Sequence, residues 1–355
     1  MRKARFISGF VLSWLALAAV PAAAQQPRIA NARLETRSAA SGLQATVRAI
    51  VERKQEPAWI GYAVPMIPGE HRMCCHDSSD CCGGCRLEGG SGFIHQRDSD
   101  EPILLEGGDR LLVLLRVAGR RVQKIRPFSE GCALDAGGLQ AYWLTDADPA
   151  QSVRLLASYV ERYRYEADPG EDAVAAIAFH AGEAADQTLS QFAEPARPEW
   201  LRKKTAFWLG AARGRRGFQL LQQMLEKDPS AEVQEKVVFG LYVSKQPEAT
   251  EALIRAARSH RRFEVRKKAL FWVGQKAGKQ AAAAIVEVIE HDPNLDLKKR
   301  AVFALSQLPQ DEGVPLLIRV ARTHKHPVIR KKAIFWLGQS NDPRALAFFE
   351  EVLAR

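Results

Sequence analysis

A 32-residue internal repeat in the second half of the chain constrains its fold more than any other feature. Each copy is a ten-residue segment that mixes basic and apolar residues, and a second apolar segment precedes each of the later four in constant register, at Leu221, Leu253, Ile285 and Leu317. A fixed period of this length is typical of arrays in which each unit is one supersecondary element. The five copies are LRKKTAFWLG from Leu201, VQEKVVFGLY from Val233, VRKKALFWVG from Val265, LKKRAVFALS from Leu297 and IRKKAIFWLG from Ile329.

Turn signals between the apolar segments predict that each unit is a pair of helices. Asp228-Pro229 and Asp292-Pro293 combine a capping residue with one that opens a helix. A single helical hairpin cannot bury its apolar face alone, so stacked neighbours complete the core and form an α-solenoid. Weaker copies extend the predicted array upstream to residue 148, and the helix over 344–353 is expected to cap it. The predicted solenoid domain is 148–355.

The repeats resemble the HEAT-repeat family, particularly the short bacterial type called lyase-like HEAT repeats. The match is an Asp-Pro turn followed by Val-Arg-x-x-Ala-x-x-x-Leu-Gly, seen with small variations at 265–274 and 329–338. It covers about half of the chain and implies an armadillo-like helical scaffold whose second helices line a concave wall. Such arrays usually bind partners, so the resemblance implies protein binding and names no reaction.

A row of cations and aromatic rings is predicted on this wall. In the third copy, Lys267 and Phe271 lie opposite the buried stripe at a spacing of i, i+4, and Lys268 flanks them, so a ring can meet an ammonium group. The same positions recur in the other copies. The candidate binding residues are Lys203, Lys204, Phe207, Lys236, Phe239, Lys267, Lys268, Phe271, Lys299, Arg300, Phe303, Lys331, Lys332 and Phe335.

Each part of this face also has a structural interpretation. The phenylalanines could fill seams between neighbouring repeats, because large apolar side chains are more often buried than exposed. The lysines could form an ordinary solvated face. The cation that precedes the lysines is expected to pair with turn acids such as Asp292, at positions Arg202, Arg266, Lys298 and Arg330. Trp208, Trp272 and Trp336 are expected in the core.

The charge is distributed unevenly along the chain. Residues 199–355 contain 29 Lys and Arg against 17 Asp and Glu, a net charge of +12, whereas residues 25–198 carry a net charge of −5. A basic array beside an acidic module favours an anionic partner, or contact between the two halves. An acidic protein or a cell-envelope polymer fits this charge. Nucleic acid fits it too, but the predicted export of the chain argues against it.

The first 24 residues have the pattern of a secretory signal peptide. Arg2, Lys3 and Arg5 precede an apolar stretch from Phe10 to Val20, and an Ala-x-Ala site ends at Ala24. The stretch is short for a membrane span, and the rest of the chain contains no transmembrane candidate. We therefore expect an exported protein, periplasmic or secreted in a bacterial envelope, with a mature chain from Gln25.

Residues 25–147 predict a small α+β or mainly β module of no recognised family. Expected strands are 59–64, 93–95, 103–106, 111–117 and 122–128, with a hairpin turn at 118–120 and a helix over 39–54. Export and an even cysteine count favour disulfides, whose pairing is open. A zinc-like site at Cys82 and Cys85 with His71 or His76, and free or exchanging thiols, are the alternatives. The disulfide candidates are Cys74, Cys75, Cys81, Cys82, Cys85 and Cys132.

No catalytic constellation is recognisable, and no cofactor is predicted. The sequence lacks a nucleophile elbow, a phosphate loop and a Rossmann glycine pattern. The paired His-Glu dipeptides through which some HEAT-like hydroxylases bind iron are also missing. The histidines at 260, 291, 324 and 326 are expected on the surface of turns. The prediction is a binding scaffold; the alternative is a HEAT-like enzyme or enzyme-assembly factor of redox, lyase or hydroxylase type, with its chemistry in the cysteine module.

Overall fold

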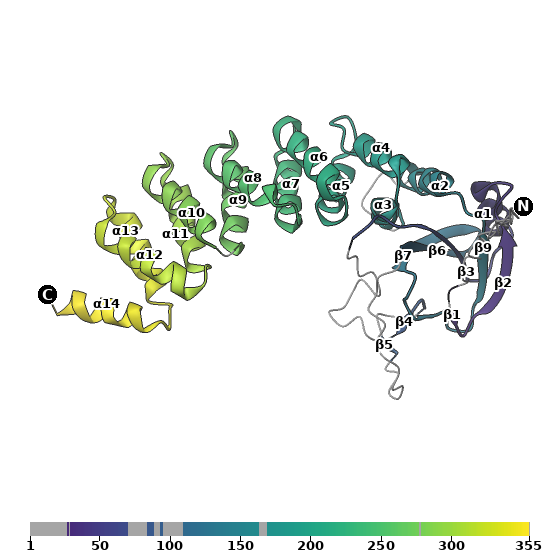
Figure 1. The fold of residues 1–355 in the computed structure, drawn as a ribbon, viewed down its shortest axis with the longest axis horizontal. Coiled ribbons are helices and arrows are strands. Elements are labelled where there is room, and N and C mark those ends of the chain that lie inside the picture. Colours follow the sequence, from purple (N-terminus) through teal and green to yellow (C-terminus); the bar gives the residue numbers. More distant parts are fainter. Residues whose placement is uncertain are drawn as a thin grey trace, which may run out of the picture.

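The computed structural model describes residues 27, 29–69, 84–88, 93–94, 109–162, 169–276 and 278–354. The predicted signal peptide, the predicted strand over 103–106 and the cysteines at 74, 75, 81 and 82 lie outside these ranges. Within them, no helix is long and apolar enough to cross a membrane. A sheet module forms one end of the molecule, and a curved row of helices extends from it to the other end (Figure 1).

Two sheets make up the N-terminal module. The larger sheet has the strand order β2-β9-β3-β6-β7. In it β2, β9 and β3 pair in parallel, β6 pairs antiparallel with β3, and β7 pairs antiparallel with β6. The smaller sheet has the order β1-β8-β4-β5. The strands are β1 Ile29–Ala30, β2 Arg33–Ser38, β3 Ala58–Pro65, β4 Gly84–Arg86, β5 Phe93–Ile94, β6 Arg110–Ala118, β7 Arg121–Ser129, β8 Leu134–Asp135 and β9 Gln140–Thr145.

Both faces of the larger sheet are buried, which explains why its central strands are almost continuously apolar. Alternate residues such as Ile60 and Val113 face the helices, whereas Trp59 and Leu112 belong to a second apolar cluster on the opposite face. The predicted strands over 59–64, 111–117 and 122–128 correspond to β3, β6 and β7. A turn at Gly119 joins β6 to β7. The sequence did not predict β2 and β9.

Helices occupy the rest of the described chain. The five repeated segments all lie in helices, as predicted, and the expected helix over 39–54 is shorter, at Leu43–Val51. The helices are α1 Leu43–Val51, α2 Pro149–Arg162, α3 Gly170–Phe179, α4 Glu183–Phe192, α5 Glu199–Ala212, α6 Gly214–Lys227, α7 Ala231–Val243, α8 Glu248–Ser259, α9 Phe263–Gln275, α10 Lys279–His291, α11 Leu295–Ser306, α12 Gln310–Thr323, α13 Pro327–Leu337 and α14 Pro343–Leu353.

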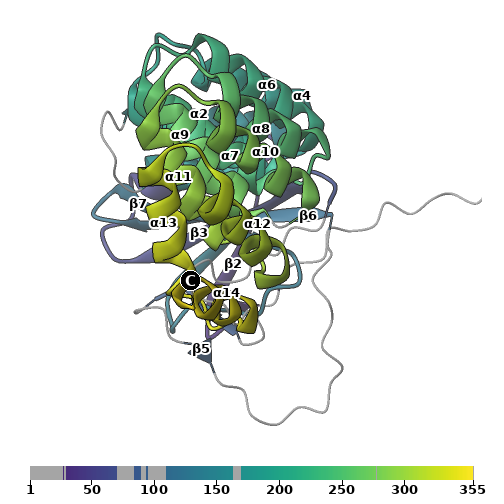
Figure 2. The same ribbon diagram turned by 90° about the vertical axis from the view of Figure 1, so that its left-hand side faces the viewer.

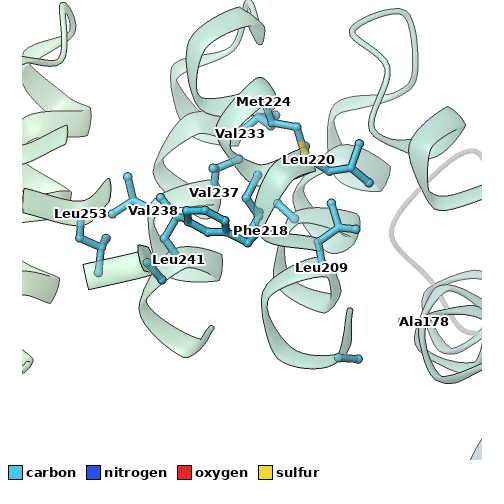
Figure 3. Close-up of a cluster of buried hydrophobic side chains, with 14 of the residues drawn as sticks. Ala178, Leu209, Phe218, Leu220, Met224, Val233, Val237, Val238, Leu241 and Leu253 are labelled. Carbon is cyan, nitrogen blue, oxygen red and sulfur yellow. The ribbon is translucent and has the colours of Figure 1, made fainter. Parts of the chain in front are cut away.

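The array consists of two rows of helices. The repeated basic segments form an inner row of α5, α7, α9, α11 and α13, and the outer row contains α6, α8, α10 and α12. Figure 2 looks along the array and separates these rows on its two sides. Apolar side chains from both rows meet between them; in Figure 3, Phe218 of α6 lies beside Val238 and Leu241 of α7.

Small residues let the inner helices pack with their backbones almost in contact. A Cβ atom added to Gly210 on α5 would lie 2.0 Å from the carbonyl oxygen of Gly240 on α7, and one on Gly274 of α9 would lie 3.1 Å from the Cβ of Ala304 on α11. The outer helices are separated by grooves, such as the one lined by Leu225 and Ala252 between α6 and α8. The inner helices are therefore closely packed, whereas grooves separate the outer helices.

The sheet module and the helical array share one apolar core. The core runs without a break from Ile60 through the helices α2 and α3 into the inner row, past the predicted domain boundary between residues 147 and 148. A buried polar chain spans the same junction. The Ser152 hydroxyl on α2 lies 2.9 Å from the Tyr62 hydroxyl on β3 and 2.8 Å from His180 Nε2, just after α3.

Arg213 completes this junction from the first repeat. Its guanidinium donates to the carbonyl oxygens of Ala178 and His180, at 3.1 and 2.6 Å, and pairs with Asp186. His180 is fully buried and donates from Nδ1 to the Ala176 carbonyl at 2.7 Å, so Nε2 accepts from Ser152. Burial, together with the nearby positive charge of Arg213, lowers the pKa of His180 to about 4. The histidine is therefore neutral at neutral pH.

We predict that Gly210→Ala destabilises the array, because the new Cβ atom has no space against the Gly240 carbonyl. The expected loss is about 3 kcal/mol of unfolding free energy, as for an overpacked core, measured by urea unfolding. Gly338→Ala is the matched control at the same repeat position, where the nearest heavy atom would be 3.5 Å away. Equal loss in the two variants would contradict this account of the packing.

We predict that acid weakens the junction through His180. The unfolded chain takes up a proton near pH 6.5, whereas the folded chain does so only near pH 4, so the stability from the neutral ring is complete above pH 6.5 and falls between these values. The full loss is roughly 3 kcal/mol. Unfolding at pH 7 and pH 4.5 should show a smaller acid loss for His180→Gln than for the unmodified chain. The same loss in both would show that other groups dominate.

Candidate functional site

The predicted phenylalanines all lie on the inner row, and their exposure alternates toward the C-terminal end. Phe271 is 38% exposed and Phe335 is 51% exposed, whereas Phe207, Phe239 and Phe303 are half-buried. Both sequence interpretations therefore hold in part. Some rings fill seams between repeats, and others are displayed to solvent.

The residue in the tryptophan position of the next inner helix explains why Phe271 is more exposed than Phe239 and Phe303. Trp272 and Trp336 reach back over the preceding inner helix, where their rings lie 4.8 Å from Phe239 and 5.0 Å from Phe303. The residue in the tryptophan position of α11 is Ala304, which is too small to cover Phe271. The three tryptophans, at 208, 272 and 336, are half-buried in these seams rather than fully enclosed in the core as predicted.

In the first, third and fourth copies, the first lysine of the pair is held by carboxylates. Lys203 bridges Glu199 and Glu232, at 3.4 and 3.2 Å, and Lys299 lies 3.0 Å from Asp296. Lys267 pairs with Glu264 and lies 5.8 Å from the Phe263 ring centroid. The predicted contact of Lys267 with Phe271 is therefore wrong, because the carboxylate one turn earlier draws the ammonium toward the helix N-terminus.

The second cation of each pair has a different environment. Lys204 pairs with Glu171. In the later copies the second cations are Lys236, Lys268, Arg300 and Lys332, and in the described ranges none of them lies within ion-pairing distance of a carboxylate. Two of these cations lie over rings at i, i+3 as predicted, with Lys236 5.5 Å from the centroid of Phe239 and Lys332 4.7 Å from that of Phe335. Lys331 is also exposed and forms no ion pair with a described residue.

The cation before each lysine pair is structural, as predicted, although its partners vary. Arg202 donates to Asp228 at 2.7 Å with both side chains buried, and Arg266 pairs with Asp292. Lys298 instead donates to the carbonyls of residues 289 and 290, and Arg330 to those of residues 324 and 325. These groups stabilise turns and are not available to a partner.

Two of the turn histidines share this structural role. The Nδ1 atoms of His260 and His324 accept from the backbone N–H two residues later, so the opposite nitrogen donates to a carbonyl of the preceding outer helix. Asp228 and Asp292 accept the equivalent N–H in the alternate repeats. His324 is 2% exposed, so its predicted surface position is wrong.

The cysteine module is only partly described. Cys132 is 5% exposed in the apolar cluster behind the sheet, just before β8. Strand β8 pairs with β4, which contains Cys85, so the two cysteines lie on neighbouring segments. Four cysteines lie outside the described ranges, and the choice among disulfides, metal and free thiols stays a prediction. Within the described ranges no three His, Cys, Asp or Glu side chains gather as for a metal ion.

The family comparison agrees with this architecture. A sequence model described as HEAT repeats matches residues 282–355, which include the last two inner helices. This match assigns residues 282–355, the C-terminal part of the chain, to HEAT repeats. The 32-residue period continues upstream of the match, and HEAT array is used below only as a name for α5 to α14. The sheet module matches no family.

Comparisons with whole proteins add little to this assignment. No curated protein sequence matches the chain. Among solved structures, human deoxyhypusine hydroxylase in complex with glycerol is similar over 57% of this chain and 90% of its own, with 18% sequence identity and a TM-score of 0.26. A similarity this low carries no functional argument for the HEAT array.

Proposed function

We propose that the protein is a binding scaffold whose HEAT array takes an acidic segment of a partner protein along its inner row. The binding face consists of the unpaired cations Lys236, Lys268, Arg300 and Lys332 with the exposed rings of Phe271 and Phe335. The observation that carries the proposal is the repetition of a cation free of described carboxylates one helical turn before a ring.

The chemistry of this face suits carboxylates beside apolar side chains. An ion already satisfied within the fold gains little from a partner, whereas the cations at the second position can form new charge-assisted contacts. The exposed rings offer apolar area between them, and aromatic residues are frequent anchors of protein interfaces. The net charge of +12 over residues 199–355 would also attract an acidic partner from a distance.

We predict that reversing three of these charges weakens acidic binding. Lys268→Glu, Arg300→Glu and Lys332→Glu together should lower the affinity for poly-L-glutamate by about tenfold, from roughly 0.5 kcal/mol per exposed pair. Fluorescence anisotropy at low and physiological salt would measure it, with circular dichroism to verify the fold.

The matched control places the same charge change on the outer side of the array. Arg216→Glu, Lys227→Glu and Arg319→Glu alter exposed cations of the outer helices α6 and α12 that form no ion pair within the described ranges. This control should keep affinity within about threefold, because only distant charge is removed. Equal losses of affinity in the two triple variants would show that net charge alone causes the effect. If the unmodified protein bound a DNA duplex or a cell-wall polymer more tightly than poly-L-glutamate, that polymer class would be assigned as the partner instead of an acidic protein.

We also propose that the protein works outside the cytoplasm, after removal of residues 1–24, with its cysteines in disulfides. The signal-like N-terminus supports export. Cys132 is buried beside the strand that contains Cys85, and this position supports a disulfide that ties the cysteine-rich segment to the sheet.

Intact mass measurement of the protein recovered from an exporting host should give a chain that starts at Gln25. Its mass should be six hydrogens below the value for free thiols, with no alkylation until reduction. The bacterial periplasm or culture medium should contain it. A chain that keeps residues 1–24, or free thiols with bound zinc, would overturn the export or the disulfide proposal respectively.

A further inference from the structure

The last hairpin of the HEAT array exposes an apolar end face. Six of the eight large apolar side chains that are exposed in the described ranges lie on α13 and α14. On α14, Leu346, Val352 and Leu353 are 62%, 50% and 85% exposed. The helix α14 was predicted to cap the array, but a capping helix should turn a polar face outward. That prediction is wrong in this respect.

Comparison with the preceding repeat shows what these residues normally contact. Leu346, Val352 and Leu353 occupy the repeat positions of Val314, Val320 and Ala321 on α12, which are 4%, 0% and 7% exposed. Helix α12 is covered by α13, the inner helix of its own hairpin. The exposed stripe on α14 is therefore the surface that an inner helix covers in the other repeats.

The inner row shows the same feature independently. Ile334 on α13 is 39% exposed, whereas its repeat equivalents Leu270 and Val302 are buried under the following inner helix, at 1% and 0%. At Gly338, the heavy atoms nearest to an added Cβ atom would belong to Phe335 and Ile334 of α13 and to Phe349 of α14, and none of these lies on a following inner helix. At the equivalent Gly274, the following helix places Ala304 in contact.

We propose that the end face formed by Ile334, Gly338, Leu346, Phe349 and Leu353 binds an amphipathic α-helix of another protein. That helix takes the position of a further inner helix. It places a small residue, Ala or Gly, against Gly338 as Ala304 lies against Gly274, and an apolar stripe against α14. Its first turn is acidic, because the exposed Lys331 would then be paired as Lys203 is paired with Glu232 across two inner helices.

The occupant is a different protein rather than a second copy. Among the described helices, those with an acidic first turn and a small residue at the contact position are α7, with Glu232 and Gly240, and α11, with Asp296 and Ala304. Both are already packed inside the row. A folded second copy has neither of them to offer.

The chain's own α11 is a suitable probe. A flexible Gly-Ser linker and a second copy of residues 294–308 are added after Arg355, because an isolated helix of this length is marginal in water and tethering raises its effective concentration. The extension should raise the melting temperature of the array by about 3 °C or more and slow hydrogen exchange in α14.

Two matched controls test the geometry. In the first control, the added copy of α11 carries Ala304→Leu, which keeps the charge and the helix propensity of the extension but prevents its close approach to Gly338. In the second control, Gly338→Leu in α13 itself blocks the site directly. Each should abolish the increase. The proposal is overturned if the melting temperature does not rise, if it rises equally in the controls, or if the unextended protein is a dimer in light scattering that Leu346→Glu dissociates, which would assign the face to a second copy.

Discussion

The close approach of the inner helices is the constraint on which the rest of the HEAT array depends. Gly210 and Gly240 bring two backbones together, and Gly274 and Ala304 do the same two repeats later. This contact fixes the rotation of each inner helix about its axis. With the small residue facing the neighbour, the basic residues lie on the exposed side of the inner row and the turn cation points toward the loops.

The turns show how the array keeps its spacing without a single conserved type of contact. Arg202 and Arg266 pair with aspartates, whereas Gln234 and Lys298 donate to backbone carbonyls of the preceding outer helix. A charge that has a buried carboxylate or several carbonyls costs little to bury. Burial still lowers the pKa of Lys298 below its ordinary value. The repeated position is thus used for architecture, and the neighbouring cations carry the available charge.

The period and apolar spacing of the sequence were enough to predict the helices of the array and the face on which the candidate residues lie. They could not rank those residues, because pairing depends on neighbours that the repeat does not preserve. Lys203 pairs with Glu232 on the next inner helix, whereas α13, which contains Lys331, has Val328 at the repeat position of that acid. In the sheet module, the polar and exposed β2 lacks the alternation that identifies a strand, so its pairing with β9 was not predictable.

The spacing of the exposed rings bears on the ligand proposed for the inner row. From α9 onward these rings lie on alternate inner helices, at Phe271 and Phe335, whereas Phe207 on α5 is half-buried. Neighbouring helices pack 8–10 Å apart, so these rings are roughly 20 Å from each other. An extended polypeptide advances about 3.3 Å per residue. An extended segment bound along the row, as proposed above, would therefore meet the second ring about six residues after the first, with Arg300 between them.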